Sequence, residues 1–258
     1  MLVAAACTGS PLTLSPVLPA HLEATVGVLR AAGCEVETVG RAKHAFSSRP
    51  NDSGSAALGL GGGGGDRSAS YYDGLVGEEL RITPPREICC GGSRGLNGGG
   101  GGLEGVLRSV DFTTEPHPGV PTDMQPQLCV MLAMAKGESR VRETVFENRF
   151  SHVHELAKMG CDVRLEAAPS SGMNGKNGKK EESHHREAVI RGSGGAPLIG
   201  ADVRGSDLRA SAALVLAGLA ARDGDVTRVE GLRHLDRGYE GLDDKLIGLG
   251  AMIRRVPM

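Results

Sequence analysis

The sequence predicts an α/β fold built from three copies of one βαβαββ-like unit. Six glycines mark the units in pairs, and each follows a helical run: Gly9 with Gly33, Gly137 with Gly160, and Gly224 with Gly250. Within the pairs the glycines are 24, 23 and 26 residues apart. Glycine commonly ends a helix just before the next strand. Three near-equal separations therefore indicate an internal repeat of helix, strand, helix and strand.

Apolar alternation places the strands of the first two units. In the first unit it predicts a strand at 12–14, with further candidates at 81–83 and 106–108. In the second unit it predicts strands at 141–145 and 188–190. The helices of both units end at the marker glycines.

Helix starts repeat in the second and third units. Thr122-Asp-Met-Gln125 has the spacing of a capping box, and Ser206 is expected to cap the third unit's helix. The helix at 208–219 is apolar on most faces, so we expect it to be buried. Strands are predicted at 226–229 and from Ile253.

The first unit lacks such a helix start. In the second unit Asp123 lies 14 residues before Gly137, and the same count back from Gly9 falls before Met1. The chain thus begins inside a helix of its own repeat. We interpret this as an N-terminal truncation.

Glycine is the anomaly of the composition, with 40 of 258 residues against a usual ~7%. Runs of glycine lie at 61–65 and 98–102. We treat 1–258 as one domain with a low-complexity insert at 48–106 and a flexible insert at 168–195. Segments so poor in packable side chains cannot offset their ordering entropy, so both are expected to be disordered.

Deletion of residues 52–76 is therefore predicted to leave stability nearly unchanged. The segment has no apolar periodicity with which to pack. Thermal unfolding of the deletion variant should give a melting temperature within a few degrees of the parent chain. A larger fall would mean that the segment packs against the domain.

Composition excludes several classes of protein. A net charge of −2 argues against a general binder of nucleic acid or of anionic membranes, and the low aromatic content (3 Tyr, 4 Phe, no Trp) argues against base stacking. The longest apolar stretch, 212–221, is too short to span a membrane. With no signal peptide recognised, we expect a cytoplasmic or plastid-stromal location. The six cysteines lack metal or disulfide spacing and are expected to be small buried apolar residues.

Two groups of charged residues are candidates for chemistry. Asp123 and Asp207 lie at helix starts, where the helix dipole favours an ionised carboxylate, although plain capping would also explain them. Arg149, Arg209 and Arg237 lie near helix starts or loops and could hold phosphate or carboxylate groups; surface ion pairing is the alternative. No metal-ligand spacing accompanies the histidines.

Four motifs, in this order and spacing, resemble the UDP-N-acetylglucosamine enolpyruvyl transferase (MurA) family: TEPHPGVPTDMQ at 114–125, ETVFENRF at 143–150, DLRASAA at 207–213 and HLDRGYE at 234–240. The resemblance covers nearly the whole chain outside the inserts. It implies an inside-out α/β barrel domain of three βαβαββ repeats. It also implies that the chain matches most of the family's C-terminal domain and lacks the N-terminal domain, with its reactive cysteine loop and its phosphoenolpyruvate-binding lysine.

The resemblance also implies an activity: transfer of an enolpyruvyl group from phosphoenolpyruvate to UDP-N-acetylglucosamine in peptidoglycan precursor synthesis, without metal or prosthetic group. Asp123 matches the residue that takes the sugar hydroxyl proton and touches the UDP-sugar. Val145 matches a backbone contact to the sugar nucleotide, and Arg149 is placed in the same binding site. Arg237 matches an arginine that closes onto the phosphoenolpyruvate phosphate. Asp207 and Arg209 match active-site residues at the domain cleft.

Three interpretations remain open from the sequence. The chain could be a truncated gene product of a full enzyme, with phosphoenolpyruvate and UDP-N-acetylglucosamine as substrates. It could be a non-catalytic half-protein that binds a UDP-sugar or a missing partner domain. It could also be a relict that only keeps its fold. None of the six cysteines fits the catalytic role.

Overall fold

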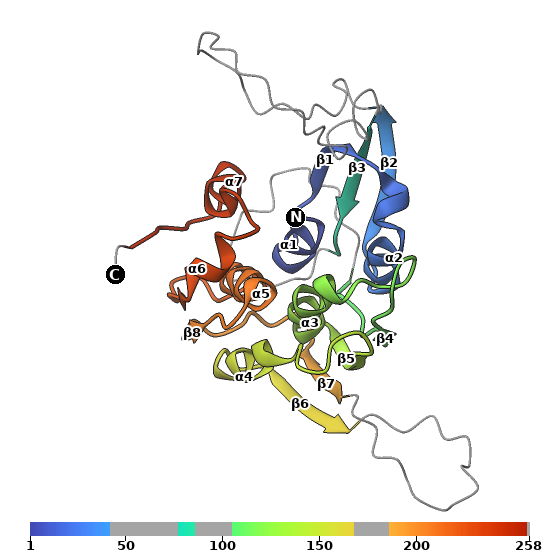
Figure 1. The fold of residues 1–258 in the computed structure, drawn as a ribbon. Coiled ribbons are helices and arrows are strands. Elements are labelled where there is room, and N and C mark those ends of the chain that lie inside the picture. Colours follow the sequence, from blue (N-terminus) through green and yellow to red (C-terminus); the bar gives the residue numbers. More distant parts are fainter. Residues whose placement is uncertain (42–76, 86–104, 168–185, 257–258) are drawn as a thin grey trace, which may run out of the picture.

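The computed structural model describes residues 1–41, 77–85, 105–167 and 186–256 (Figure 1). The glycine runs, the segment 52–76 and most of the predicted insert at 168–195 lie outside the described residues. Three units follow one another along the chain, each with its own small sheet. None of the helices in the described ranges has the length and apolar character that crossing a membrane requires.

The first unit contains an antiparallel sheet in the order β1-β3-β2. Its elements are α1 (Leu2–Thr8), β1 (Leu12–Val17), a 3₁₀ turn (Pro19–His21), α2 (Glu23–Ala31), β2 (Glu35–Arg41) and β3 (Glu78–Thr83). Gly9 ends α1 in the left-handed conformation, with φ of 63°, as its place after the helix predicts.

The central strand β3 lies inside the range 48–106. Leu80 and Ile82 on this strand are buried in the core, so 48–106 is not a continuous insert. The candidate strand at 81–83 is confirmed. The candidate at 106–108 is not a strand, and only a single bridge joins Arg108 to Lys136.

The second unit runs strand, helix, strand, helix, strand, strand. It comprises β4 (Phe112–Thr113), η2 (Thr122–Met124), α3 (Gln125–Met134), β5 (Lys136–Arg142), α4 (Ser151–Lys158), β6 (Asp162–Ala167) and β7 (Arg186–Ser193). The sheet order is β4-β5-β7-β6, with β4 parallel to β5 and the other pairs antiparallel. The strand predicted at 141–145 is shifted, because β5 already starts at Lys136 and ends at Arg142. The range 168–195 includes the core strand β7, so its described part is not a flexible insert.

The third unit is shorter. It consists of β8 (Asp202–Arg204), α5 (Leu208–Leu219), β9 (Arg228–Glu230), α6 (Leu232–Leu235) and α7 (Leu242–Gly248), with β8 parallel to β9. The strand predicted from Ile253 is wrong, since 251–256 has no regular structure and Met252 is 99% exposed. In the first two units this strand pairs with a following strand, β3 or β7. The described part of the third unit offers no such partner.

Three helices form the centre of the domain. α1, α3 and α5 pack against one another, and the sheets lie around them (Figure 1). Every residue of α3 is buried, and α5 is buried over most of its length, as its apolar faces predict. This arrangement, with the helices inside and the sheets outside, is the inside-out arrangement that the resemblance implies.

The four cysteines in the described residues behave as packing residues. Cys7, Cys34 and Cys129 are buried, whereas Cys161 is half-buried. Burial raises the pKa of Cys34 and of Cys161 to about 12. These thiols are therefore protonated near neutral pH and are poor nucleophiles.

Candidate functional site

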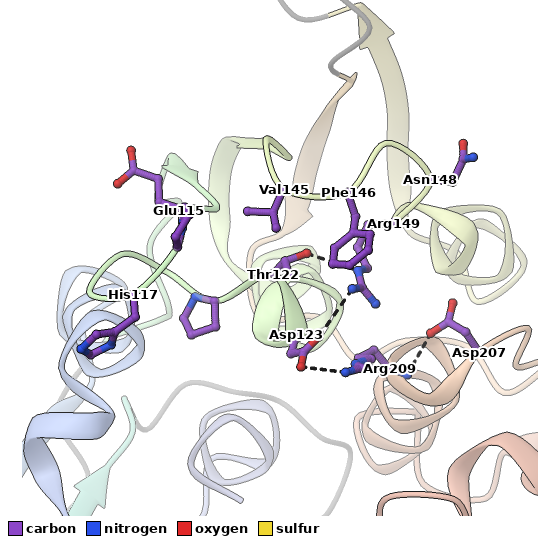
Figure 2. Close-up of a pocket in the computed structure, with 12 residues that line it drawn as sticks. Glu115, His117, Thr122, Asp123, Val145, Phe146, Asn148, Arg149, Asp207 and Arg209 are labelled. Carbon is purple, nitrogen blue, oxygen red and sulfur yellow. Dashed lines mark hydrogen bonds and ion pairs between the residues drawn. The ribbon is translucent and has the colours of Figure 1, made fainter.

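A cavity of about 640 Å³ opens where two loops of the second unit meet the start of α5 (Figure 2). One loop precedes α3 and the other joins β5 to α4. The lining residues combine charged, aromatic and proline side chains: Glu115, Pro116, His117, Pro121, Thr122, Asp123, Val145, Phe146, Asn148, Arg149, Asp207 and Arg209. Five of the six site residues expected from the sequence are in this set; Arg237 is not.

Asp123 lies on η2 between two guanidinium groups. Its Oδ2 accepts from Arg209 at 2.8 Å, and its Oδ1 faces Arg149 at 3.5 Å. The side chain remains 52% exposed, so the carboxylate is open to the cavity. The hydrogen bond that Arg209 donates to Asp123 is the main cause that raises the pKa of Arg209. The structure thus brings together residues that are 86 positions apart.

The predicted capping box is wrong. The helix begins with a 3₁₀ turn whose N-cap, Pro121, makes no side-chain cap bond. The Thr122 hydroxyl instead donates to Glu143 Oε2 at 2.9 Å and accepts from Arg149 Nε at 3.2 Å. The Thr122 hydroxyl thus makes hydrogen bonds with residues distant in the sequence and none with the backbone of its own helix start. Asp123 therefore does not cap a helix, and capping does not explain its position.

Asp207, by contrast, is a helix cap. It is the N-cap of α5 and accepts from the N–H groups of Arg209 at 2.9 Å and Ala210 at 3.0 Å, so the cap predicted at Ser206 is wrong by one residue. The Ser151 hydroxyl adds a third bond at 3.0 Å. Partial burial alone would raise the pKa of Asp207. The bonds from Ala210, Ser151 and Arg209 outweigh it and hold the pKa below its usual value.

Arg149 forms the rear of the cavity. Its side chain is only 11% exposed, and the guanidinium lies 4.6 Å from the centre of the Phe146 ring. Such stacking suits arginine and fixes the direction of its donors. Val145 lines the same wall, with its N–H bound by Glu143 Oε1 at 2.8 Å.

Arg237 lies away from the cavity, exposed in the turn after α6. Among the described residues it has no hydrogen-bond or ion-pair partner. The surface ion pairing given as the alternative is therefore not seen for Arg237 among the described residues, and the neighbouring Asp236 pairs with Arg255 at 2.7 Å.

Three residues of the site were missed by the sequence analysis. Phe146 is 55% exposed at the cavity mouth, and Thr122 and Glu143 organise the wall behind it. Phe146 is one of only seven aromatics in the chain and lies in the ETVFENRF motif at 143–150, which was a usable signal. Nothing in the local sequence marks Glu143, because its burial depends on contacts 21 and 29 residues away.

A buried histidine lies next to the site on α4. His152 is fully buried, and neither ring nitrogen has a hydrogen-bond partner among the described residues. Burial lowers its pKa from 6.5 to about 4. The imidazole is therefore neutral at pH 7.

This pKa predicts acid destabilisation between pH 6.5 and pH 4. In that window the unfolded chain binds a proton at His152 that the folded chain does not. The contribution of the neutral His152 to the free energy of unfolding is therefore fully present above pH 6.5 and is lost as the pH falls toward 4. The loss is expected to reach roughly 3 kcal/mol. Urea unfolding at pH 7 and pH 4.5 should show it in the parent chain and in His154→Gln, whose histidine is exposed on the same helix. His152→Leu should lose most of it. An equal fall in His152→Leu would contradict this assignment.

No group of three or more His, Cys, Asp or Glu in the described ranges could hold a metal ion. The cavity presents two guanidinium groups and three carboxylates, those of Glu115, Asp123 and Asp207. Guanidinium groups suit phosphate and carboxylate ligands, and an exposed carboxylate can accept a proton.

Comparison with known proteins places this site in a family. A family model described as EPSP synthase (3-phosphoshikimate 1-carboxyvinyltransferase) matches residues 100–246, more than half of the chain. The chain belongs to this family. All five expected site residues that line the cavity lie within the matched range.

Curated relatives extend the likeness to nearly the whole chain. A UDP-N-acetylglucosamine 1-carboxyvinyltransferase of Magnetococcus marinus is 35% identical over 99% of this chain, and one of Oleidesulfovibrio alaskensis is 50% identical over 60%. The chain spans 42% and 32% of their lengths. It therefore corresponds to less than half of these relatives.

Solved structures of the family support the fold. The enolpyruvyl transferase NikO from Streptomyces tendae matches 98% of the chain with a TM-score of 0.61 at 24% identity. The matched part is 43% of the NikO chain. EPSP synthase from Acinetobacter baumannii matches all of it with a TM-score of 0.57 at 14% identity. At these identities the likeness concerns the fold alone.

Proposed function

We propose that this chain provides the sugar-nucleotide side of a UDP-N-acetylglucosamine 1-carboxyvinyltransferase site. The observation that carries the proposal is Asp123, a half-exposed carboxylate held between Arg149 and Arg209 in the large cavity. The names of the curated relatives support UDP-N-acetylglucosamine as the acceptor of a carboxyvinyl group. Phosphoenolpyruvate as the donor follows from the family resemblance. In that role the chain would act in peptidoglycan precursor synthesis in the cytoplasm.

The proposed chemistry assigns each residue a step. The sugar hydroxyl gives its proton to Asp123 as its oxygen bonds to C2 of phosphoenolpyruvate, while C3 takes up a proton from solvent or from the further domain. C3 then loses a proton, the double bond re-forms and the C–O bond to phosphate breaks, so that phosphate leaves. Asp123 can receive the proton because its two salt-bridge contacts leave other lone pairs open to the cavity. Arg149 and Arg209 hold Asp123 in place. Val145, on the same wall as Arg149, contacts the sugar nucleotide through its backbone.

Asp207 and Arg237 take different parts in the proposal. Asp207 fixes the start of α5 and thereby the backbone of Arg209. Arg237 is exposed outside the cavity, so its proposed contact with the phosphoenolpyruvate phosphate requires closure of a further domain over this face. A bidentate guanidinium suits that phosphate.

A second candidate is a non-catalytic half-protein that binds a UDP-sugar or a partner domain. The position of Arg237 outside the cavity lining favours it, because the proposed contact to the phosphoenolpyruvate phosphate is then missing from the cavity. In this case the cavity binds the sugar nucleotide, but no enolpyruvyl transfer follows.

The test uses a fusion of a family N-terminal domain ahead of Met1. We expect the fusion to release phosphate from phosphoenolpyruvate at least about a hundredfold faster with UDP-N-acetylglucosamine than with 3-phosphoshikimate, a ratio typical of a pocket built for one acceptor. The reverse preference would contradict the proposed acceptor. Binding of UDP-N-acetylglucosamine without turnover by a folded fusion would favour the second candidate.

A further inference from the structure

Glu143 is a buried carboxylate directly behind the cavity. It follows β5, is 2% exposed and forms no salt bridge with a described residue. Four donors surround it instead: Oε1 accepts from Thr114 Oγ1 at 2.7 Å and from the N–H groups of Val145 and Phe146 at 2.8 and 3.0 Å, and Oε2 accepts from Thr122 Oγ1 at 2.9 Å. A buried carboxyl group is tolerated only when its oxygens are bound in this way.

These bonds join the two loops that form the cavity. Thr114 and Thr122 lie on the loop before α3, whereas Val145 and Phe146 begin the loop after β5. Thr114 also accepts from the Thr144 N–H at 3.1 Å. No helix or strand covers residues 143–149, and the Glu143 side chain takes part in four of the hydrogen bonds that hold this segment in place.

The bond to Thr122 extends the effect to the charged centre. A hydroxyl that donates to Glu143 turns its lone pairs to other donors, and Arg149 Nε occupies one at 3.2 Å. The same guanidinium lies 3.5 Å from Asp123 (Figure 2). Glu143 therefore sets the direction of the Thr122 hydroxyl, and the hydroxyl sets the position of Arg149 beside Asp123.

We propose that Glu143 is the positioning residue of this site. It does not touch the ligand. It holds the Val145 and Phe146 backbone and the Arg149 side chain in the geometry that receives the sugar nucleotide. The identity of that ligand rests on the proposed function, but the ordering of the loop does not.

The experiment compares Glu143→Ala with a matched control, Glu187→Ala. Glu187 is also buried and acts as an acceptor, for Arg140 at 2.9 Å and Arg142 at 3.2 Å. Neither arginine lines the cavity. Hydrogen exchange is measured over 144–149 in the ligand-free 258-residue chain, and binding of UDP-N-acetylglucosamine is measured by ligand-observed NMR.

We expect Glu143→Ala to speed exchange of the Val145 and Phe146 amides, and to weaken binding, each by about tenfold, the net worth of one or two hydrogen bonds. Glu187→Ala should leave both close to the parent chain. Glu143→Gln should restore amide protection, because its Oε1 can still accept from Thr114, Val145 and Phe146. General loss of stability would not separate the variants in this way.

Equal exchange over 144–149 in Glu143→Ala and Glu187→Ala would overturn the proposal. If Glu143→Ala does not fold, Glu143→Asp replaces it: the charge stays while the carboxylate is withdrawn by one methylene, and unchanged exchange would overturn the proposal. If the parent chain fails to bind UDP-N-acetylglucosamine, the proposed function is lost, whereas the exchange data still decide the role of Glu143.

Discussion

Asp123→Asn in the fusion with a family N-terminal domain is expected to cut turnover by ~10²–10⁴, the usual worth of a general base. Asparagine has nearly the same shape and keeps an oxygen for Arg209 or Arg149, but it cannot take up the hydroxyl proton. Turnover is measured as phosphate release at saturating substrates.

The fold should survive this change. Asp123 caps no helix, and its contacts to Arg149 and Arg209 are partly exposed ion pairs worth about 0–1 kcal/mol. Asp202→Asn is the matched control, because Asp202 pairs with Arg228 at 3.6 Å on the surface of β8. The control should keep full turnover. If Asp123→Asn instead unfolds the protein and leaves turnover per folded molecule unchanged, Asp123 is structural and not the base.

The 258-residue chain by itself is expected to release no measurable phosphate from phosphoenolpyruvate in the presence of UDP-N-acetylglucosamine. By resemblance the site of this family is shared between two domains, and the chain spans about two fifths of its relatives. The cavity is open, and Arg237 is exposed outside it. Without groups that position phosphoenolpyruvate and exclude water, most transition-state stabilisation is lost.

The assay for this prediction is steady-state phosphate release by the purified chain, with the fusion as positive control. Turnover by the chain alone that disappears in Asp123→Asn would show that the half-site suffices. Turnover that persists in Asp123→Asn would point to a contaminating phosphatase and would not contradict the prediction.

The sequence predicts the fold well where the signal is local. Gly9 takes the left-handed conformation expected of a residue that ends a helix. The apolar faces of α5 predict its burial in the centre. The strand expected from Ile253 fails because a strand needs a neighbour, and the alternation of the segment cannot show whether one exists.

The site was predictable only in part. The TxxQ spacing at Thr122 suggests a cap, but the Thr122 hydroxyl instead donates to the buried carboxylate of Glu143. The approach of Arg209 to Asp123 depends on the packing of α5 beside α3, which no local pattern records. The family resemblance alone singled out Val145, whereas Arg237 was also a candidate from its place near a helix start or loop. The structure places Val145 in the cavity and leaves Arg237 outside it.

The central claim is that the cavity around Asp123 receives the sugar nucleotide. Backbone chemical-shift mapping of the isotope-labelled chain during titration with UDP-N-acetylglucosamine tests it most directly. We predict shifts in the amides of 115–123, 145–149 and 207–209, and their loss in Asp123→Ala. The contradicting result is an absence of shifts at millimolar ligand, or shifts confined to the smaller cavity of about 290 Å³ beside Arg191 and Arg222.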